Sequence, residues 1–430
     1  MNLSGRRIRG GAADAVSEGH LGGFWRNVAT LLGGQVSRLA VQAVYFVLLA
    51  RVLEPSAFGL AAAIMAVGAL ASPFAALGLN TIMVRNVARN GTSIGSEWKR
   101  SLTYTAIGGT ALSLLLSLLV PVIIQTDLHF GILFIILLTD LVGLRLIDLS
   151  AALWHTVGSS RQLALMPTVM NLLRMAAVIL FALIVDVPSL NSWALFYLAS
   201  TLPLGLVLSA ITSWRLRGGK WKIGASMFEI KDGVLFSISL SSQSAFNDID
   251  KTMLANLQSA SSAGLYTAAY RIVDMAYAPI RSIAAAAYPR LFRAGGTGLN
   301  STMVLVKKIA PMVIGFGILG SLGLFFLAPY STILLGEDYQ GSVEIISFLA
   351  PLVLLRGISF LAADALSSSG LHGYRTAVQV GLVAVNVVLN LLLIPSYGVL
   401  GAVVSTLICE VILSLALWVR IAYGLRKADR

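Results

Sequence analysis

The sequence predicts an all-α membrane protein that crosses the bilayer many times. Of its 430 residues, 57% are hydrophobic and only 12% are charged, and the mean hydropathy is +0.84. Soluble domains average about 25% charged residues, so this chain lacks the charge to cover a water-exposed surface. The composition therefore excludes a soluble enzyme, a disordered chain and a fibrous protein. The apolar runs are long and do not alternate in polarity, which excludes a transmembrane barrel.

The apolar runs predict twelve transmembrane helices, because a bilayer core about 30 Å thick needs about 20 apolar residues per helix. The predicted spans are residues 28–50, 59–80, 102–124, 130–153, 163–185, 193–214, 233–256, 263–288, 309–333, 343–366, 377–396 and 399–419. The third and ninth are the plainest. The basic residues Arg6, Arg7 and Arg9 are separated from the first span by a polar stretch, unlike those of a signal peptide. The first span is therefore expected to be retained.

The Lys and Arg residues outside the spans predict the orientation. They gather at both termini and in the loops after spans 2, 4, 6, 8 and 10, whereas the other loops hold Arg51 alone and carry acids such as Asp127 and Glu337. By the positive-inside rule, both termini are cytoplasmic. The net charge of +12 thus comes from short basic loops that set the orientation in the membrane. Nucleic acid is therefore not an expected partner. Attraction of the loop from Arg215 to Lys222 to anionic membrane lipids remains an alternative role for those charges.

The spans are predicted to form two six-helix lobes. A shift of 205 residues places Gly59 on Gly264, Leu60 on Leu265 and Arg85 on Arg290. Because six is even, the two halves enter the membrane in the same direction, which predicts a pseudo-twofold axis along the membrane normal. The predicted order is a cytoplasmic tail (1–27), an N-lobe (28–214), a cytoplasmic loop (215–232), a C-lobe (233–420) and a cytoplasmic tail (421–430).

Polar side chains mark one face of the first span of each half. They are Gln35, Arg38, Gln42 and Tyr45 in the first span and Gln243, Asn247, Asp250 and Lys251 in the seventh. Steps of three and four residues put each set on one helical face, and the 205-residue shift aligns the two sets in depth. Lipid penalises such faces, so we expect a water-filled cavity between the lobes. The alternative is a polar seam buried within one lobe.

Fourteen charged residues fall within the predicted spans, where each is costly if it faces lipid. The cations are Arg38, Arg145, Arg174, Lys251, Arg271, Arg281 and Arg356, and the acids are Asp140, Asp148, Asp248, Asp250, Asp274, Asp364 and Glu410. Two pairs three residues apart, Arg145 with Asp148 and Arg271 with Asp274, can neutralise each other. Arg174 can meet Asp140 or Asp148 on the neighbouring span.

Arg38 has no acid within helical reach in its own span and is therefore assigned to an anionic ligand, since guanidinium groups bind phosphate bidentately. Asp250, Asp364 and Glu410 are candidates for coupling to protons or cations, with structural pairing as the alternative. The tyrosines of the eighth span have two possible interpretations. Tyr266, Tyr270 and Tyr277 share one face of the eighth span, as a sugar-stacking wall or as helix packing.

The sequence predicts no catalytic chemistry. It has no P-loop pattern, its single cysteine is Cys409, and its four histidines are scattered. No metal site, cofactor or catalytic residue is therefore expected. Seven prolines lie in or near the spans and can hinge them, namely Pro73, Pro121, Pro167, Pro203, Pro279, Pro311 and Pro351.

Three short motifs resemble those of the polysaccharide flippase family. Residues 50–60 read ARVLEPSAFGL, similar to the family's L-x-P-x-x-F/Y-G at the junction of its first two spans, although Leu60 and Ala61 stand where a tyrosine is usual. Residues 264–271 read GLYTAAYR, like the counterpart in the second half. Asn386, Asn390 and the run IPSYGVLGA at 394–402 are similar to its N-x-x-x-N…I-P-x-Y-G-x-x-G-A signature.

The resemblance implies the O-antigen and exopolysaccharide branch of the multidrug/oligosaccharidyl-lipid/polysaccharide exporter superfamily. It implies a non-enzymatic flippase of the bacterial inner membrane that moves polyprenyl-pyrophosphate-linked oligosaccharides by alternating access. Polymerases and glycosyltransferases of the same pathway are implied partners. The family's cationic cavity residues carry over to Arg38 and Arg271. Together with the polar faces, the predicted substrate-binding set is Arg38, Gln42, Arg174, Gln243, Asn247, Lys251 and Arg271.

Two other functions remain as alternatives. A cation-coupled multidrug exporter of the same superfamily would need a net acidic site for organic cations, which the intramembrane arginines oppose. A membrane polymerase or ligase of polysaccharide assembly would need a large external loop with catalytic side chains. The predicted external loops are short, so the enzyme is disfavoured.

Overall fold

The computed structural model describes residues 40–90, 93–156, 160–216, 224 and 226–428. The described residues are almost entirely helical, so the prediction of an all-α polytopic membrane protein is confirmed. Nine helical stretches among them are long and apolar enough to cross a membrane. Each coincides with one of the twelve predicted spans. Of the first predicted span, the structure describes the helical segment Ala40–Val52.

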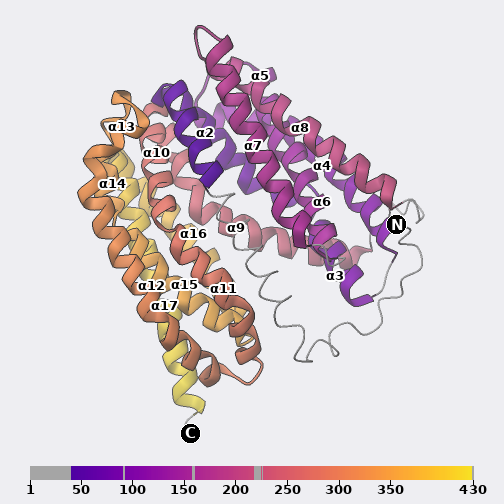
Figure 1. Cartoon of the computed structure of the whole chain (residues 1–430), viewed down its shortest axis with the longest axis vertical. Helices are drawn as coiled ribbons and strands as arrows, with labels where there is room; N and C mark the ends of the chain where they lie inside the picture. Colours follow the sequence, from indigo (N-terminus) through magenta and orange to yellow (C-terminus); the bar gives the residue numbers. More distant parts are fainter. Residues whose placement is uncertain (1–39, 91–92, 157–159, 217–223, 225, 429–430) are drawn as a thin grey trace.

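The first half of the chain forms the upper right part of the molecule in Figure 1. Its elements after the segment Ala40–Val52 are α2 (Pro55–Ala71), η1 (Ser72–Phe74), α3 (Leu79–Asn90), α4 (Ile94–Ile124), α5 (Phe130–Leu138), the π-helical segment η2 (Thr139–Leu144), α6 (Arg145–Thr156), α7 (Ser160–Ile184) and α8 (Leu190–Arg215). Helices α4 to α8 pack mainly on one another.

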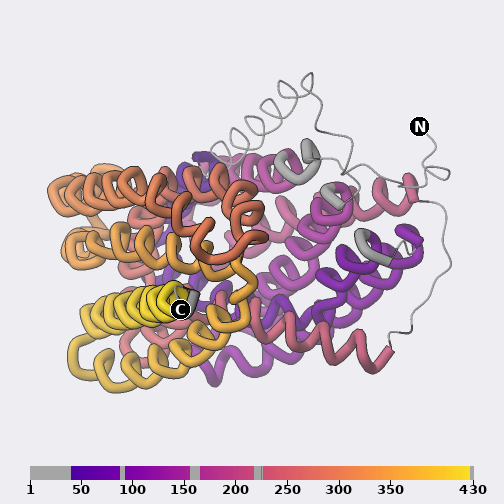
Figure 2. Tube along the Cα trace, turned by 90° about the horizontal axis from the view of Figure 1, so that it is seen from below, coloured from indigo at the N-terminus to yellow at the C-terminus, as the bar shows by residue number. Residues whose placement is uncertain are grey.

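The second half forms the lower left part. Its elements are α9 (Met227–Leu257), α10 (Ala260–Ala276), α11 (Ala278–Gly295), α12 (Leu299–Leu327), η3 (Ala328–Tyr330), α13 (Ser331–Leu335), η4 (Glu337–Tyr339), α14 (Ser342–Leu349), α15 (Leu352–Ser368), α16 (His372–Tyr397) and α17 (Val399–Ala428). Helices α12, α15, α16 and α17 pack together, and the view from below shows the two halves side by side (Figure 2). The two-lobe prediction is therefore confirmed.

Three predicted spans differ from straight apolar helices. The second ends at Phe74, where a turn with positive φ at Leu77 and Gly78 leads into the separate helix α3. The eighth is two helices, α10 and α11, because Pro279 starts the second one. The seventh, α9, is one continuous helix that is not among the apolar spanning stretches, because it carries serines and other polar residues as well as the charged Asp248, Asp250 and Lys251.

The halves meet most closely at α2 and α10. A Cβ atom on Gly59 would lie 1.9 Å from the Ala260 carbonyl oxygen, and one on Gly264 would lie 1.9 Å from the Pro55 carbonyl oxygen. No side chain fits between these backbones. Gly59 and Gly264 are equivalent under the 205-residue shift, and equivalent residues meet in this reciprocal way only beside a twofold axis. The contact therefore lies at the pseudo-twofold axis.

Helix α9 joins the halves along its length. It packs on α10 and α16 of its own half and also on α2, α3 and α4. Its serine hydroxyls donate to carbonyl oxygens of the first half, Ser237 to Pro73 at 2.8 Å and Ser241 to Leu70 at 2.7 Å. The seam between the halves is thus polar along α9, and the cavity described next lies on the same seam.

Candidate functional site

A cavity lies between the two halves, with about 780 Å³ of empty volume that includes open solvent. The first half lines it from the segment Ala40–Val52 and from α2, η2, α6, α7 and α8, and the second half lines it from α9 and α10. Its charged lining residues are Asp140, Arg145, Arg174, Asp248, Lys251 and Arg271. The lining therefore has four cations and two acids, and two of the cations, Arg145 and Arg271, are paired with Asp148 and Asp274, which lie outside the lining.

The wall on the first half is organised by Arg174 of α7. Its Nε donates to Thr201 Oγ1 at 3.0 Å, and an Nη donates to the Tyr197 hydroxyl at 3.0 Å. The Tyr197 hydroxyl in turn donates to Asp140, and the guanidinium stacks 4.5 Å from the centre of the Tyr197 ring. Asp140 lies in the π-helical segment η2, a distortion that is frequent at functional sites. Arg174 is therefore held rigidly at the cavity wall.

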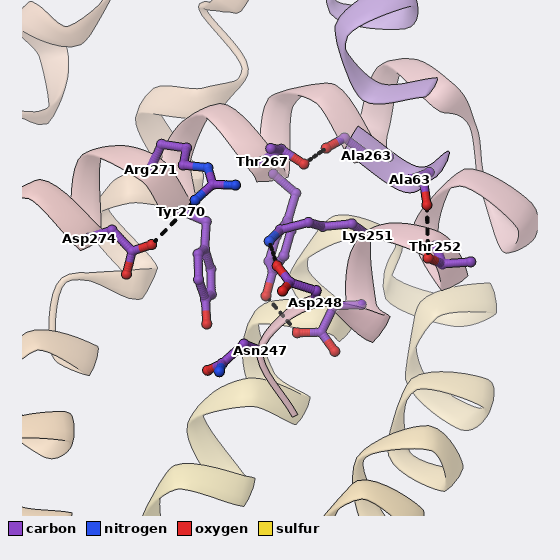
Figure 3. A network of polar contacts seen from close by, with 12 residues as sticks. Ala63, Asn247, Asp248, Lys251, Thr252, Ala263, Thr267, Tyr270, Arg271 and Asp274 are labelled. Atoms are coloured by element: carbon purple, nitrogen blue, oxygen red, sulfur yellow. Dashed lines mark hydrogen bonds and ion pairs between the residues drawn. The ribbon is translucent and has the colours of Figure 1, made fainter. Parts of the chain in front are cut away.

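The wall on the second half carries two more cations (Figure 3). Lys251 pairs with Asp248, three residues earlier on α9, and lies 4.9 Å from the centre of the Tyr270 ring. Arg271 of α10 stacks 4.1 Å from the centre of the Phe46 ring, which belongs to the first half. Its Nη1 also lies 3.9 Å from Asp274. Arg271 thus touches both halves at the cavity.

A second polar cluster is buried inside the second half, away from the cavity lining. The Asp250 carboxylate accepts hydrogen bonds from the Tyr266 hydroxyl at 2.8 Å, from Asn390 Nδ2 at 2.9 Å and from Thr406 Oγ1 at 2.7 Å. Asn390 Nδ2 also donates to Asn386 Oδ1 at 2.9 Å. These side chains come from α9, α10, α16 and α17, so the carboxylate ties four helices of one half together.

The other two predicted coupling acids lie apart from Asp250. Asp364 on α15 is 3.9 Å from Arg375, and one of its carboxylate oxygens is buried without a hydrogen-bond partner among the described residues. Glu410 on α17 is 4.0 Å from Arg356 Nε. All three acids are almost completely buried, and each has its own contacts among the described residues.

The cavity brings together Arg174, Lys251 and Arg271 of the predicted binding set. Arg38 lies outside the described residues. The three predicted polar residues Gln42, Gln243 and Asn247 are not among the lining residues, and Asn247 Nδ2 donates instead to the Gln243 carbonyl oxygen at 2.9 Å.

Sequence reasoning did not assign Asp140, Tyr197 or Asp248 to the site. The intramembrane charge of Asp140 and Asp248 was the available signal, whereas Tyr197 is a single tyrosine with no pattern around it. The two paired cations Arg145 and Arg271 bear out the pairing three residues apart, with Arg145 3.2 Å from Asp148. Tyr266 and Tyr270 are buried, which favours the helix-packing interpretation of the tyrosine face over a sugar-stacking wall.

Comparison with known families decides the classification. A family described as "polysaccharide biosynthesis protein" matches residues 24–294, more than half of the chain. The chain belongs to the polysaccharide biosynthesis protein family. The match includes the motifs at 50–60 and 264–271 and ends before the one at 386–402. The recognition of a polysaccharide flippase family is confirmed at this level. Among curated proteins, no sequence match was found.

This chain has a fold similar to those of solved transporter structures. It resembles an inward-facing multidrug resistance MATE transporter of the MOP superfamily, with 13% identity, a TM-score of 0.74, and 91% of this chain and 99% of that chain covered. An outward-facing MATE transporter gives 15% identity and a TM-score of 0.58, with 93% and 96% covered. These similarities show a two-lobed, MATE-like transporter fold.

A further neighbour concerns the charge of the cavity. A MOP superfamily transporter from Pyrococcus furiosus, described as having a binding pocket of reversed polarity that suggests a different function, gives 15% identity and a TM-score of 0.60, with 92% and 96% covered. Chains of this fold therefore differ in pocket charge, and substrate class has to be argued from the cavity itself. The described residues contain no group of three or more His, Cys, Asp or Glu side chains able to hold a metal ion.

Proposed function

We propose that this protein translocates polyprenyl-pyrophosphate-linked oligosaccharides across the bacterial inner membrane by alternating access. The observation that supports this most strongly is the cation-rich cavity on the seam between the halves, lined by Arg174, Lys251 and Arg271. The lining has more cations than acids. Asp148 and Asp274 pair with Arg145 and Arg271 from outside the lining, but Nε of each of these arginines is buried without a hydrogen-bond partner among the described residues, so donors remain for an anionic ligand. Diphosphate is such an anion, and arginine binds it in bidentate fashion.

The cations of the cavity differ in how rigidly their side chains are held, and this gives them different roles in binding. Arg174 is fixed by Thr201 and Tyr197, so it presents a preorganised guanidinium. Lys251 has rotatable donors and exchanges its contact with Asp248 for the ligand. Arg271 touches Phe46 of the opposite half, so a diphosphate at Arg271 contacts both halves at once. The glycan then extends toward the polar residues Gln42, Gln243 and Asn247, and the polyprenyl chain stays in the lipid.

Release on the outer side requires the halves to rock about the connection between α8 and α9. Of the predicted coupling acids, Asp250 is the best supported, because one carboxylate joins α9, α10, α16 and α17. Protonation or cation binding there would alter the packing of four helices. Asp364 and Glu410 are second candidates. The polymerase and glycosyltransferases of the pathway remain proposed partners.

Export of polysaccharide by a deletion strain complemented with variants tests the proposal. Arg38→Ala, Arg174→Ala and Arg271→Ala are each expected to reduce export about tenfold or more, since hydrogen bonds to charged groups contribute about 1.5–3 kcal/mol. The matched control is Lys308→Ala, which removes an exposed cation away from the cavity and is expected to export normally. Full export by both Arg38→Ala and Arg271→Ala, at normal protein levels, would reject the diphosphate assignment.

The competing transport function is multidrug export, because two of the similar folds are described as multidrug resistance transporters. Organic cations need an acidic site, and the cavity has more cations than acids. A drug-sensitivity panel separates the two. The deletion strain is expected to keep its drug resistance and to lose its polysaccharide. Hypersensitivity to cationic drugs with normal polysaccharide would favour the exporter.

A further inference from the structure

Asp274 on α10 is shared by three arginines from three helices. Its Oδ1 lies 3.1 Å from Nη1 of Arg356 on α15 and 3.4 Å from Nη2 of Arg281 on α11, and its Oδ2 lies 3.9 Å from Nη1 of Arg271 on α10. Arg356 also contacts the Tyr270 hydroxyl. One carboxylate thus serves as the common counterion of three guanidinium groups, which we call the Asp274 cluster.

The Asp274 cluster has more positive charge than its carboxylates neutralise. A second acid, Glu410, lies 4.0 Å from Arg356 Nε, so three cations face two anions among these groups. Two donors of the cluster, Arg271 Nε and Arg281 Nε, are buried and have no hydrogen-bond partner among the described residues. A buried donor without a partner is costly. The cluster therefore has both charge and hydrogen bonds to offer an anion.

The Asp274 cluster begins at the cavity and leads away from it. Arg271 lines the cavity, whereas Arg281 and Arg356 do not, and the Arg281 side chain is 41% exposed. Arg281 lies on α11, on the far side of the helix break at Tyr277 from Arg271. In the predicted orientation, α10 runs toward the cytoplasm and α11 continues in that direction. The exposed Arg281 is thus on the side from which the ligand would enter.

We propose that the Asp274 cluster is a second anion subsite, which receives a diphosphate group before it reaches Arg174 and Lys251, and in which Asp274 is the resident anion that the ligand displaces. This inference rests on the proposed function for the identity of the ligand. A diphosphate carries several acceptor oxygens on two phosphorus atoms, so it can bridge Arg281 and Arg271 as Asp274 does. Once it is bound, Arg271 passes it to the cavity, because Arg271 belongs to both sites.

A purely structural ion-pair network predicts the opposite response to removal of the carboxylate. If Asp274 only holds α10, α11 and α15 together, Asp274→Asn disorders the arginines and weakens anion binding or leaves it unchanged. If Asp274 competes with the ligand, the same substitution strengthens binding. The sign of the change therefore separates the two explanations.

The experiment titrates inorganic pyrophosphate into the full chain in phosphatidylcholine nanodiscs at low ionic strength, by calorimetry. Asp274→Asn is expected to bind about tenfold more tightly than the wild type, because a competing charge is removed. The matched control is Asp232→Asn, since Asp232 is also 23% exposed and is paired with an arginine, Arg85, at 2.8 Å. Asp232 is not among the cavity lining, so its variant is expected to bind as the wild type does.

Arg281→Gln keeps the test decisive if Asp274→Asn fails to fold, since Arg281 is the most exposed member of the cluster. It is expected to bind pyrophosphate about tenfold more weakly. Unchanged binding by Arg281→Gln, or unchanged or weaker binding by folded Asp274→Asn, would overturn the subsite. Either result leaves the proposed function standing as long as Arg174→Ala still lowers both binding and export. A different result would reject the proposed function alone. In that case Asp274→Asn binds pyrophosphate more tightly and Arg281→Gln binds it more weakly, but the deletion strain still exports polysaccharide normally.

Discussion

Arg100 connects the halves by charge at a point far from the cavity lining. On α4, its Nη2 lies 2.7 Å from Glu97 of the same helix, and its Nη1 lies 3.2 Å from Glu229 at the start of α9. Asn86 Nδ2 donates to Glu229 at 3.1 Å. Burial raises the pKa of the Glu229 carboxyl, but hydrogen bonds from the Ser226 backbone, Arg100 and Asn86 outweigh it, and the pKa lies below its ordinary value of 4.5.

Glu229 is therefore expected to make stability depend on pH on the acid side. A carboxyl whose pKa is lowered by folding stabilises the protein above its unfolded pKa, and the contribution is lost as the pH falls through the folded value. Wild-type protein should lose thermal stability when the pH falls from 6 to below about 4.5. Glu229→Gln should start less stable at pH 6 and lose less. Parallel losses in the two proteins, measured by thermal unfolding, would contradict this role.

At this scale, sequence reasoning found two of the ion pairs whose partners lie on one helix and missed a third, Lys251 with Asp248. The pairs Arg145 with Asp148 and Arg271 with Asp274 follow from spacing alone. It found Arg174 near Asp140 only as one of two choices, because Tyr197, which bridges them, comes from α8 and leaves no pattern. The sharing of Asp274 by Arg281 and Arg356 could not be predicted, because it depends on how α11 and α15 pack against α10.

At the scale of the helices, hydropathy placed the nine stretches of the described residues that are long and apolar enough to cross a membrane, but not the breaks within the spans. Pro73 lies in η1, Pro279 starts α11, and Pro351 precedes α15, so these three prolines interrupt spans as predicted. Pro167 and Pro203 instead lie inside continuous helices. Neighbouring helices and polar side chains can satisfy the backbone groups that a proline frees within a membrane. Whether a proline breaks a helix thus depends on tertiary packing, which the sequence does not reveal.

The contact of α2 with α10 is expected to tolerate no side chain. Gly264→Ala places a methyl group 1.9 Å from the Pro55 carbonyl oxygen, so the helices must separate, and overpacking of this kind costs about 1–3 kcal/mol. The thermal unfolding temperature of purified Gly264→Ala should fall. Gly315→Ala in α12 is the control, because nothing lies within 4 Å of its Cβ position and alanine favours a helix over glycine by about 1 kcal/mol. Equal effects of the two substitutions would show that the contact is looser than described.

For the whole molecule, the two halves and their repeat were predictable from the sequence. The reason is that residues in contact at the pseudo-twofold axis are still of the same type when the halves are aligned with a shift of 205 residues. Gly59 and Gly264 align in sequence and touch in space. A cavity between the halves was predictable from the polar faces of the first and seventh spans, but Gln42, Gln243 and Asn247 are not in its lining. Helical spacing shows which residues share a face, whereas the tilt and rotation of the first and seventh spans decide which part of that face reaches the cavity.

The charge asymmetry of the whole chain makes its orientation testable by cysteine labelling. Cys409 is only 1% exposed, so the natural chain should react little with a membrane-impermeant maleimide, and single added cysteines report their own side. Asp186 and Lys307 are exposed residues on opposite predicted sides, an acidic outer loop and a basic inner one. Asp186→Cys should label in intact spheroplasts, and Lys307→Cys only after lysis, because basic loops stay in the cytoplasm. The reverse pattern would invert the molecule and place the exposed Arg281 on the outer side, so that the Asp274 cluster would receive ligand from outside the cell.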